Sequence, residues 1–313
     1  MNIGLDMMGG DFSPLEAVRG VQLYLRESPA PAVLWLVGDE QLLRPLLEEQ
    51  GVPAEAVRIV NAGQVIEMNE HPTRALKEKP QSSIAIGFQL LASGQMDAFI
   101  SAGNTGAMLV GAHYHLKPIE GIQRPTISTV IPKDNGRTGV LLDVGLNADC
   151  KPENLNQFAV LGSLYAQHIL GIPRPRVGLL NIGEEEGKGN ILTQTAYPLL
   201  KENDQIHFIG NIEGRDLLID KADVMVCEGY TGNVILKLAE SLFDISRRQR
   251  IENEFFDRFD FEYYGGTPLL GVTKPVIIGH GISRGKSFLN MVKLAQKMLE
   301  TDLLGKMKES FLS

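Results

Sequence analysis

The sequence contains few cysteines, few aromatic residues and no long hydrophobic run. Its 313 residues include two cysteines and one tryptophan, and the aromatic fraction is 6%. Two cysteines cannot form the disulfide framework that stabilises many small secreted domains. Apolar runs such as AVLWLVG, from Ala32, are far shorter than the roughly 18 residues that a membrane-spanning helix needs. We therefore expect neither a disulfide-rich secreted protein nor an integral membrane protein.

Positive charge is also scarce. Lysine and arginine number 30 against 38 aspartates and glutamates, which gives a formal net charge of -8. Such a balance provides no overall attraction to nucleic acid, so we expect no nucleic-acid partner. The first residues, MNIGLDMMGGD, follow a strand pattern and lack the basic and then apolar segment of a signal peptide. A cytoplasmic protein is the expectation.

Short β-rich runs alternate with longer amphipathic segments along the chain. The expected strands are Asn2 to Asp6, Val33 to Val37, Arg58 to Val60, Ala98 to Ser101, Val177 to Asn181, Ile206 to Ile209, Val224 to Cys227 and Val276 to Ile278. Most are continuously apolar, as strands buried on both faces are. The alternation predicts an α/β protein with a mostly parallel sheet between two layers of helices.

One region departs from this alternation. Residues 126–145, TISTVIPKDNGRTGVLLDVG, read as two strands joined around Asn135-Gly136, a dipeptide that favours a tight turn. We expect a β-hairpin insertion there. The sequence has no low-complexity linker and no internal repeat, so residues 1–313 are expected to form a single catalytic unit. Two lobes and two separable domains both fit this pattern.

Six polar, glycine-bearing loops follow expected strands. They are DMMGGDFSP (6–14), SAGNTGA (101–107), DVGLNADCKPEN (143–154), NIGEEEGKGN (181–190), CEGYTGNV (227–234) and IIGHGISRG (277–285). Loop amides and helix N-termini at the carboxyl ends of strands carry partial positive charge. Each loop alone could simply turn the chain or cap a helix, but six together suggest a crevice for an anion-bearing ligand.

Several common motifs can be set aside. GEEEGKG has three residues between its first two glycines where a Walker A loop has four, and Gly189 follows Lys188 where Ser or Thr should bind magnesium. No strand-linked G-x-G-x-x-G appears, which disfavours a nicotinamide enzyme. GISRG matches a nucleophile elbow, but no histidine follows His280 in the chain. His113 and His115 would point in different directions on a helix, which disfavours a zinc site. We expect neither a metal nor a cofactor.

Cys150 lies between Asp149 and Lys151 and could be an acyl-accepting nucleophile. A buried structural cysteine is the alternative, and no histidine lies near it in the sequence.

Together, these stretches resemble one family, the bacterial phosphate acyltransferases of phospholipid synthesis. The matching segments, which span nearly the whole chain, are DMMGGDFSP, SAGNTGA, LLDVGLNADCKPENLNQFA, VGLLNIGEEEGKGN, FIGNIEGRD, KADVMVCEGYTGNVILK, YGGTPLLGV and IIGHGISRGKSF. Leu146, Ile282 and Arg284 depart from the family's pattern. The resemblance implies transfer of a fatty acyl group from acyl-(acyl carrier protein) to inorganic phosphate. It also implies an α/β/α fold similar to the isocitrate and isopropylmalate dehydrogenases and to phosphotransacetylases, a homodimer, and work beside the membrane.

For such a reaction we expect direct attack of bound phosphate on the thioester. Lys188 is the expected charged clamp, and His280 the group that protonates the leaving thiolate or donates to the oxyanion, with a structural histidine as the alternative. The expected neutral donors are Asn104, Asn147 and Asn233. Asp6, Asp143 and Glu184 are expected to orient these groups. Further candidate phosphate or substrate contacts are Gly9, Gly10, Asp11, Thr105, Gly187, Gly189, Asn190 and Thr231.

The three glutamates beside Lys188 raise a separate question, because ionised carboxylates repel phosphate. We expect most of residues 184–186 to turn away, holding Lys188, capping a neighbour or crossing to a second subunit. Gly187 and Gly189 would let Lys188 point inward, and Asn190 would cap the helix ILTQTAYPLLK.

The partner surface is expected in the helical segment 234–262. Acyl carrier protein is acidic, and the densest basic run, SRRQR, supplies Arg247, Arg248 and Arg250. This segment could contact the carrier, the inner face of the membrane or the second subunit, or it could simply pack with a solvated basic edge. Two other functions remain open: a phosphotransacetylase-like acyltransferase that uses acyl-coenzyme A, and a binding protein that senses phosphate or acyl groups without turnover.

Overall fold

The computed structural model describes residues 1–312, except the side chain of residue 261. The chain divides into two compact units. Unit 1 contains residues 1–117, 261–268 and 272–300, and unit 2 contains residues 118–260, 269–271 and those from 301 onward. Within residues 1–312, no helix combines the length and the apolar character needed to cross a bilayer.

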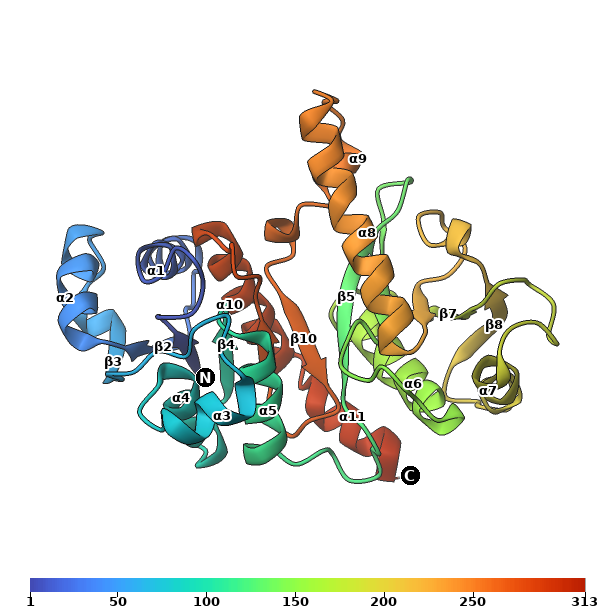
Figure 1. Ribbon diagram of the computed structural model, residues 1–313, viewed down its shortest axis with the longest axis horizontal. Helices are drawn as coiled ribbons and strands as arrows, with labels where there is room; N and C mark the ends of the chain where they lie inside the picture. Colours follow the sequence, from blue (N-terminus) through green and yellow to red (C-terminus); the bar gives the residue numbers. More distant parts are fainter. Residues whose placement is uncertain (313) are drawn as a thin grey trace. The chain divides into compact units, whose positions relative to one another are not determined.

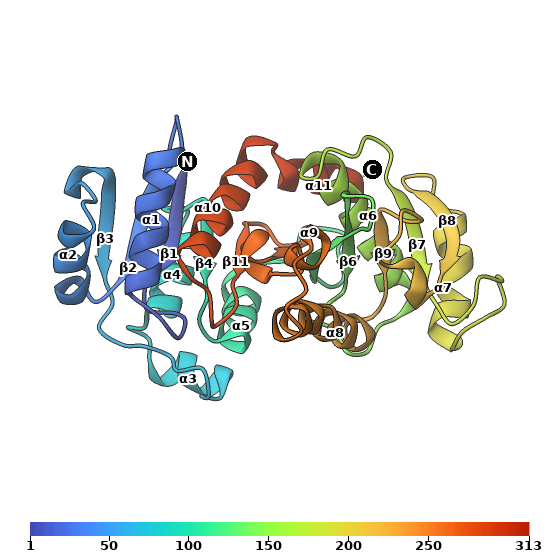
Figure 2. The same ribbon diagram turned by 90° about the horizontal axis from the view of Figure 1, so that it is seen from above.

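Unit 1 is a parallel sheet covered by helices on both faces. Its strands are β1 (Asn2–Asp6), β2 (Val33–Gly38), β3 (Val57–Asn61), β4 (Ala98–Ser101) and β11 (Val276–Ile278), in the order β3-β2-β1-β4-β11. Its helices are α1 (Leu15–Glu27), α2 (Glu40–Glu49), α3 (Pro72–Glu78), α4 (Ser83–Ala92), α5 (Thr105–His115) and α10 (Gly285–Glu300). Helices α1 and α10 pack together on one face, and α4 and α5 cover the other (Figure 2). The loops that follow β1, β4 and β11 therefore lie at one edge.

The strands of unit 2 run in mixed directions. Its strands are β5 (Thr126–Pro132), β6 (Thr138–Leu142), β7 (Arg176–Leu180), β8 (His207–Ile212) and β9 (Val224–Val226), in the order β5-β6-β9-β7-β8. Only the β5–β6 pair within this order is antiparallel. Its helices are α6 (Pro152–His168), α7 (Ile191–Lys201), α8 (Gly229–Arg248), α9 (Glu254–Asp257) and α11 (Leu303–Leu312). Helix α6 packs against α11 and the strands, whereas α8 extends away from the sheet with α9 at its end (Figure 1).

The predicted fold class is confirmed, including the hairpin between β5 and β6. Gly136 has a φ of +84° at the predicted turn, and its N–H donates to Lys133 O at 3.1 Å. One strand escaped the sequence analysis: β10 (Thr267–Leu270) pairs antiparallel with β5 through Leu269 and Leu270. It is short, contains Pro268 and follows two glycines, all of which weaken a strand pattern.

Candidate active site

In unit 1, the loop after β1 is organised by the carboxylate of Asp6, which is fully buried. This carboxylate accepts hydrogen bonds from Met8 N at 3.0 Å and Ser101 Oγ at 2.6 Å. Ser101 Oγ in turn accepts Gly103 N at 2.9 Å. A Cβ atom at Gly9 would lie 2.4 Å from Asp6 Oδ2 and 2.6 Å from Gly103 N, so the two loops can approach only because residue 9 is glycine.

Burial raises the pKa of Asp6, although the hydrogen bonds it accepts oppose this shift. Its contacts hold together the loops that follow β1 and β4. Ser101, which links the two loops, was not recognised from the sequence, because a single serine at a strand end gives no specific signal.

The loop after β11 joins the same edge of unit 1. Asp11 N donates to Gly281 O at 2.7 Å, which brings the loop of Gly9 and Gly10 against the one that carries His280. His280 is half-buried at the end of β11, and its carbonyl accepts Ser283 N at 2.9 Å. Ser283 is only 1% exposed, so its hydroxyl is not an accessible nucleophile, in agreement with setting the elbow motif aside.

Asn104 has a structural role in this conformation. Its Oδ1 caps α5 by accepting Ala107 N at 2.9 Å. Its Nδ2 donates to three backbone carbonyls, those of Glu67 at 3.0 Å, Met68 at 3.3 Å and Glu70 at 3.0 Å. Both the oxygen and the nitrogen of this amide are thus engaged, so the expected donation from Asn104 to a substrate is not available in this conformation. The neighbouring Thr105 is exposed and is the first residue of α5.

In unit 2, the loop after β6 repeats this arrangement around Asp143. The buried carboxylate accepts Ile127 N at 3.0 Å, Asn147 N at 2.6 Å and Asn147 Nδ2 at 2.9 Å. Burial again raises the carboxyl pKa against the effect of these hydrogen bonds. Asn147 Nδ2 also donates to Pro125 O at 2.8 Å, so this amide holds the loop and is not available as the expected neutral donor.

The start of α8 packs against the Asp143 loop. Glu228, which the sequence analysis did not single out, is the N-cap and accepts Thr231 N at 2.8 Å. A Cβ atom at Gly232 would lie 1.8 Å from Asp143 O, so glycine is required at this contact. Asn233 is exposed, although its Nδ2 donates weakly to Val144 O at 3.2 Å. Of the three asparagines expected to be donors, only Asn233 combines exposure with a single internal hydrogen bond.

Cys150 also belongs to this part of unit 2, where its Sγ lies 3.6 Å from Asn147 O. Burial, followed by the charge of Asp143, raises the pKa of the Cys150 thiol to about 12. Burial raises the pKa of the Cys227 thiol as well. Both thiols are therefore protonated near neutral pH, which favours the structural reading of Cys150.

The loop 181–190 follows β7, and two of its three glutamates pair with lysines outside the loop. Glu184 pairs with Lys221 at 2.7 Å, and Glu186 pairs with Lys201 at 3.1 Å. Lys188 is exposed and makes no ion pair with any residue in 1–312. The two glutamates thus turn away, as expected, but they hold lysines other than Lys188.

The carbonyl groups of this loop are occupied by neighbouring side chains. Asn211 Nδ2 donates to Glu185 O at 2.8 Å, Asn181 Nδ2 donates to Lys188 O at 3.0 Å, and Gln194 Nε2 donates to the carbonyls of residues 187 and 189 at 3.0 Å each. No backbone N–H of residue 187 or 189 bonds to a described residue. Asn190 Oδ1 accepts Thr193 N at 2.9 Å, which confirms the predicted cap of α7. The loop can therefore offer N–H groups beside one free ammonium group, the arrangement that binds anions.

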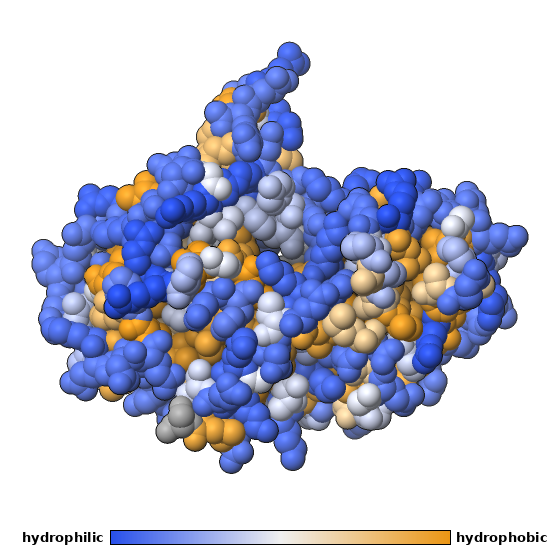
Figure 3. Space-filling model, turned by 180° about the vertical axis from the view of Figure 1, so that it is seen from behind, coloured by the Kyte–Doolittle hydropathy of each residue, from blue (hydrophilic) through white to orange (hydrophobic). Residues whose placement is uncertain are grey.

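The arginine run lies at the end of α8. Arg247 pairs with Asp257 at 3.2 Å, and its guanidinium lies over Phe243 at 4.9 Å from the ring centroid. Arg248 and Arg250 are exposed. Along the same helix, an apolar stripe is exposed to solvent: Tyr230, Val234, Leu238 and Ile245, at 69%, 54%, 65% and 43%. Hydrophobic side chains near the hydrophilic tip of this projecting segment are visible in Figure 3.

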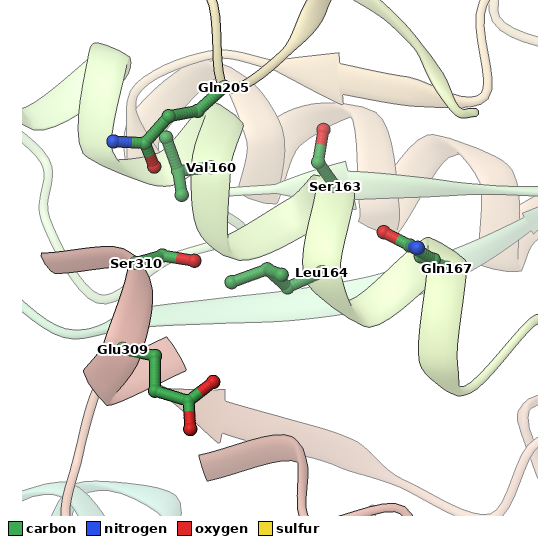
Figure 4. A pocket seen from close by; sticks show the side chains of 7 residues that line it. All are labelled: Val160, Ser163, Leu164, Gln167, Gln205, Glu309 and Ser310. Carbon is green, nitrogen blue, oxygen red and sulfur yellow. The ribbon is translucent and has the colours of Figure 1, made fainter. Parts of the chain in front are cut away.

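A separate cavity of about 340 Å³ lies between α6 and α11 in unit 2. Figure 4 shows Val160, Ser163, Leu164 and Gln167 on α6 facing Gln205 and two residues of α11, Glu309 and Ser310. It contains none of the sequence-predicted site residues. Among residues 1–312, no group of three or more His, Cys, Asp or Glu side chains is arranged to hold a metal ion.

Comparisons with known proteins identify the family. The family model "Fatty acid synthesis protein" matches residues 1–306. The phosphate acyltransferase of Dictyoglomus turgidum is 42% identical, over 99% of this chain and 97% of its own. That of Aquifex aeolicus is 43% identical, over 96% and 94%.

Among solved structures, a phosphotransacetylase from Streptococcus pyogenes has a TM-score of 0.65 at 18% identity and covers 96% of this chain and 94% of its own. A branched-chain phosphotransacylase from Enterococcus faecalis has a TM-score of 0.63 at 16% identity, over 96% and 99%. At these identities the likeness shows the fold alone. The sequence matches are much stronger, and by them the chain belongs to the fatty acid synthesis protein family, an enzyme family whose curated members named here are phosphate acyltransferases.

Proposed function

We propose that this protein transfers a fatty acyl group from acyl-(acyl carrier protein) to inorganic phosphate and releases acyl phosphate for phospholipid synthesis. Family membership supports acyl transfer to phosphate. The observation that carries the proposal is the loop 181–190. Four of its carbonyls accept hydrogen bonds from side-chain amides, and Glu184 and Glu186 pair with lysines outside the loop. Lys188 therefore remains available for an anion.

Phosphate is proposed to bind to Lys188 and to the backbone N–H groups of Gly187 and Gly189. An ammonium group attracts a dianion as a point charge, and fixed N–H groups add directional hydrogen bonds. Because Asn211 and Gln194 already hold the loop, little further ordering is needed when the ligand binds.

The proposed chemistry is a direct displacement. A phosphate oxygen attacks the thioester carbonyl carbon, a C–O bond forms, and the resulting oxyanion collapses as the C–S bond breaks. The leaving thiolate takes a proton, for which His280 is the proposed donor. Asn233 is the proposed neutral donor to the oxyanion. The raised pKa of Cys150 supports this route over an acyl-enzyme.

The proposal extends to the protein's surroundings. We propose a cytoplasmic homodimer that works beside the inner face of the membrane, with segment 234–262 making the intermolecular contact. The exposed stripe on α8 supports a contact of this kind, because apolar side chains spaced by four and seven residues line one helix face.

The reaction is tested with purified protein, palmitoyl-(acyl carrier protein) and inorganic phosphate. We expect phosphate-dependent release of carrier thiol, with acyl phosphate identified by mass spectrometry. Faster turnover of palmitoyl-coenzyme A would favour the phosphotransacetylase-like alternative. Phosphate binding with no turnover of either thioester would indicate a sensor.

The Lys188→Ala variant tests the phosphate site. It should lower kcat/KM for phosphate by at least about 10²-fold, the cost of losing one well-placed charge-stabilising group. Lys308→Ala is the control, because Lys308 is an exposed lysine on α11 of the same unit. Equal kinetics in the two variants would remove Lys188 from the proposed site.

A further inference from the structure

At the start of α10, an exposed surface of unit 1 combines cations with apolar side chains. We call it the α10 entry surface; its members are Phe12, Arg19, Tyr263, Ile282, Arg284 and Lys286. Phe12, Tyr263 and Ile282 are 39%, 53% and 47% exposed. Exposed large apolar side chains that gather in one place commonly mark an interaction site.

Three separate chain segments form this surface. The Arg284 guanidinium lies 4.3 Å from the centroid of the Phe12 ring. The Lys286 ammonium lies 5.7 Å from the centroid of the Tyr263 ring. A Cβ atom at Gly285, between these two cations, would lie 3.1 Å from Arg19 Cβ. The cations and aromatic rings are therefore neighbours across one continuous face.

Two carboxylates beside this face are bonded to the backbone of the α10 entry. Glu16 accepts Gly285 N at 2.7 Å through one oxygen and pairs with Arg19 at 2.6 Å through the other. Glu262 accepts Arg284 N at 3.0 Å. Negative charge is thus directed inward, to the N-terminal amides of a helix, where it is favourable.

Arg19 pairs with the carboxylate of Glu16, whereas the side chains of Arg284 and Lys286 contact aromatic rings. Within residues 1–312 neither makes an ion pair, and the partner of each is an aromatic ring. Stacking limits the conformations of a long cationic side chain, so less entropy is lost when it binds a carboxylate. The exposed carboxylate of Asp11 would lie 3.7 Å from a Cβ atom at Gly281, the neighbour of Ile282.

We propose that the α10 entry surface docks the acidic acyl carrier protein. This inference rests on the proposed function, and it identifies the part of unit 1 that recognises the acyl donor. With a formal charge of -8, the enzyme repels an acidic protein overall, so association requires a local group of unpaired cations. Phe12, Tyr263 and Ile282 add apolar contact between these cations, as binding surfaces commonly do.

Two features favour this surface over the arginine run of α8. Arg247 in that run is already paired with Asp257. Arg284 also lies four residues after His280 in the same loop, so a carrier docked there would bring its thioester arm to the loop of the proposed proton donor.

The test compares two double charge reversals in unit 1. The first variant is Arg284→Glu with Lys286→Glu, and the control is Arg26→Glu with Lys77→Glu, which changes the net charge equally at exposed positions elsewhere. Phosphate-dependent kcat/KM is measured with palmitoyl-(acyl carrier protein) and with palmitoyl-pantetheine, which lacks the protein. Dissociation constants for palmitoyl-(acyl carrier protein) are measured by calorimetry.

For the first variant we expect the kcat/KM for palmitoyl-(acyl carrier protein), divided by that for palmitoyl-pantetheine, to fall at least about tenfold. The dissociation constant for the carrier should rise by a similar factor, because like charges across an interface oppose association. The control should keep the wild-type ratio. If the wild type turns over the carrier and both variants bind it equally well, the docking surface is wrong while the proposed function stands. If the wild type shows no turnover, the proposed function fails, and the dissociation constants still decide the docking surface.

Discussion

At the scale of single residues, burial decides the chemistry available to Cys150. Burial, together with the nearby charge of Asp143, raises the pKa of its thiol to about 12. A thiol with this pKa is protonated at neutral pH, and the protonated form is a poor nucleophile. The sequence neighbours Asp149 and Lys151 gave no indication of this, because the relevant carboxylate, Asp143, lies seven residues earlier at the start of the same strand-to-helix loop.

We expect Cys150→Ser to keep phosphate-dependent turnover within about twofold of the wild type, because a protonated thiol contributes little as a nucleophile. Alkylation of Cys150 in the wild type should be slow at pH 7 and should accelerate about tenfold per pH unit up to pH 10, since the thiolate fraction rises in that proportion below the pKa. Mass spectrometry of iodoacetamide-treated protein measures these rates. A radiolabelled acyl group trapped on Cys150, or complete loss of activity in the serine variant, would require the covalent route instead.

The asparagines illustrate what sequence can and cannot predict about single residues. Asn190 was predicted as a helix cap because its partner, Thr193, is three residues away. Asn104 was a candidate donor to the substrate, with helix capping as the alternative, yet its Nδ2 donates to backbone carbonyls more than thirty residues earlier in the chain. Local spacing predicts caps. It contains no information on which distant carbonyl completes the hydrogen bonding of an amide.

At the scale of elements, the loop 181–190 depends on α7 and β8 for its shape. Gln194, on the first turn of α7, donates to two of its carbonyls, and Asn211 at the end of β8 donates to a third. The segments NIGEEEGKGN and FIGNIEGRD both contribute to the family resemblance, but the sequence does not predict their contact with each other. The parallel pairing of β7 with β8 brings them together.

We expect Gln194→Leu to raise the KM for phosphate roughly tenfold with a smaller change in kcat, because two hydrogen bonds of about 1 kcal/mol each no longer hold the loop amides in position. The melting temperature should change little, since Gln194 is exposed. Gln167→Leu, at an exposed position on α6, is the matched control. If the KM for phosphate is the same in both variants, the loop either keeps its shape without Gln194 or does not bind phosphate.

At the scale of the whole molecule, fold class was the most predictable property and assembly the least. Continuously apolar strands between amphipathic helices predicted the α/β sheets because burial on both faces leaves that composition in the sequence. The strand β10 was missed because its pairing with β5 is decided by residues far away in the chain. The exposed stripe on α8 has the spacing of any amphipathic helix, so sequence alone could not tell a core face from an intermolecular one.

Assembly through this stripe can be tested by introducing charge into it. We expect Val234→Asp with Leu238→Asp to convert a homodimer to a monomer, because the two side chains are 54% and 65% exposed in the single chain and an unpaired carboxylate is costly to bury at an interface. Sedimentation velocity gives the mass of each species. Leu42→Asp, at a position 49% exposed on α2, is the control and should leave the dimer intact. A monomeric wild type at the same concentration, or a dimeric double variant, would show that the stripe does not form a dimer interface. Sedimentation of the same proteins with lipid vesicles would then test whether the stripe contacts a membrane surface.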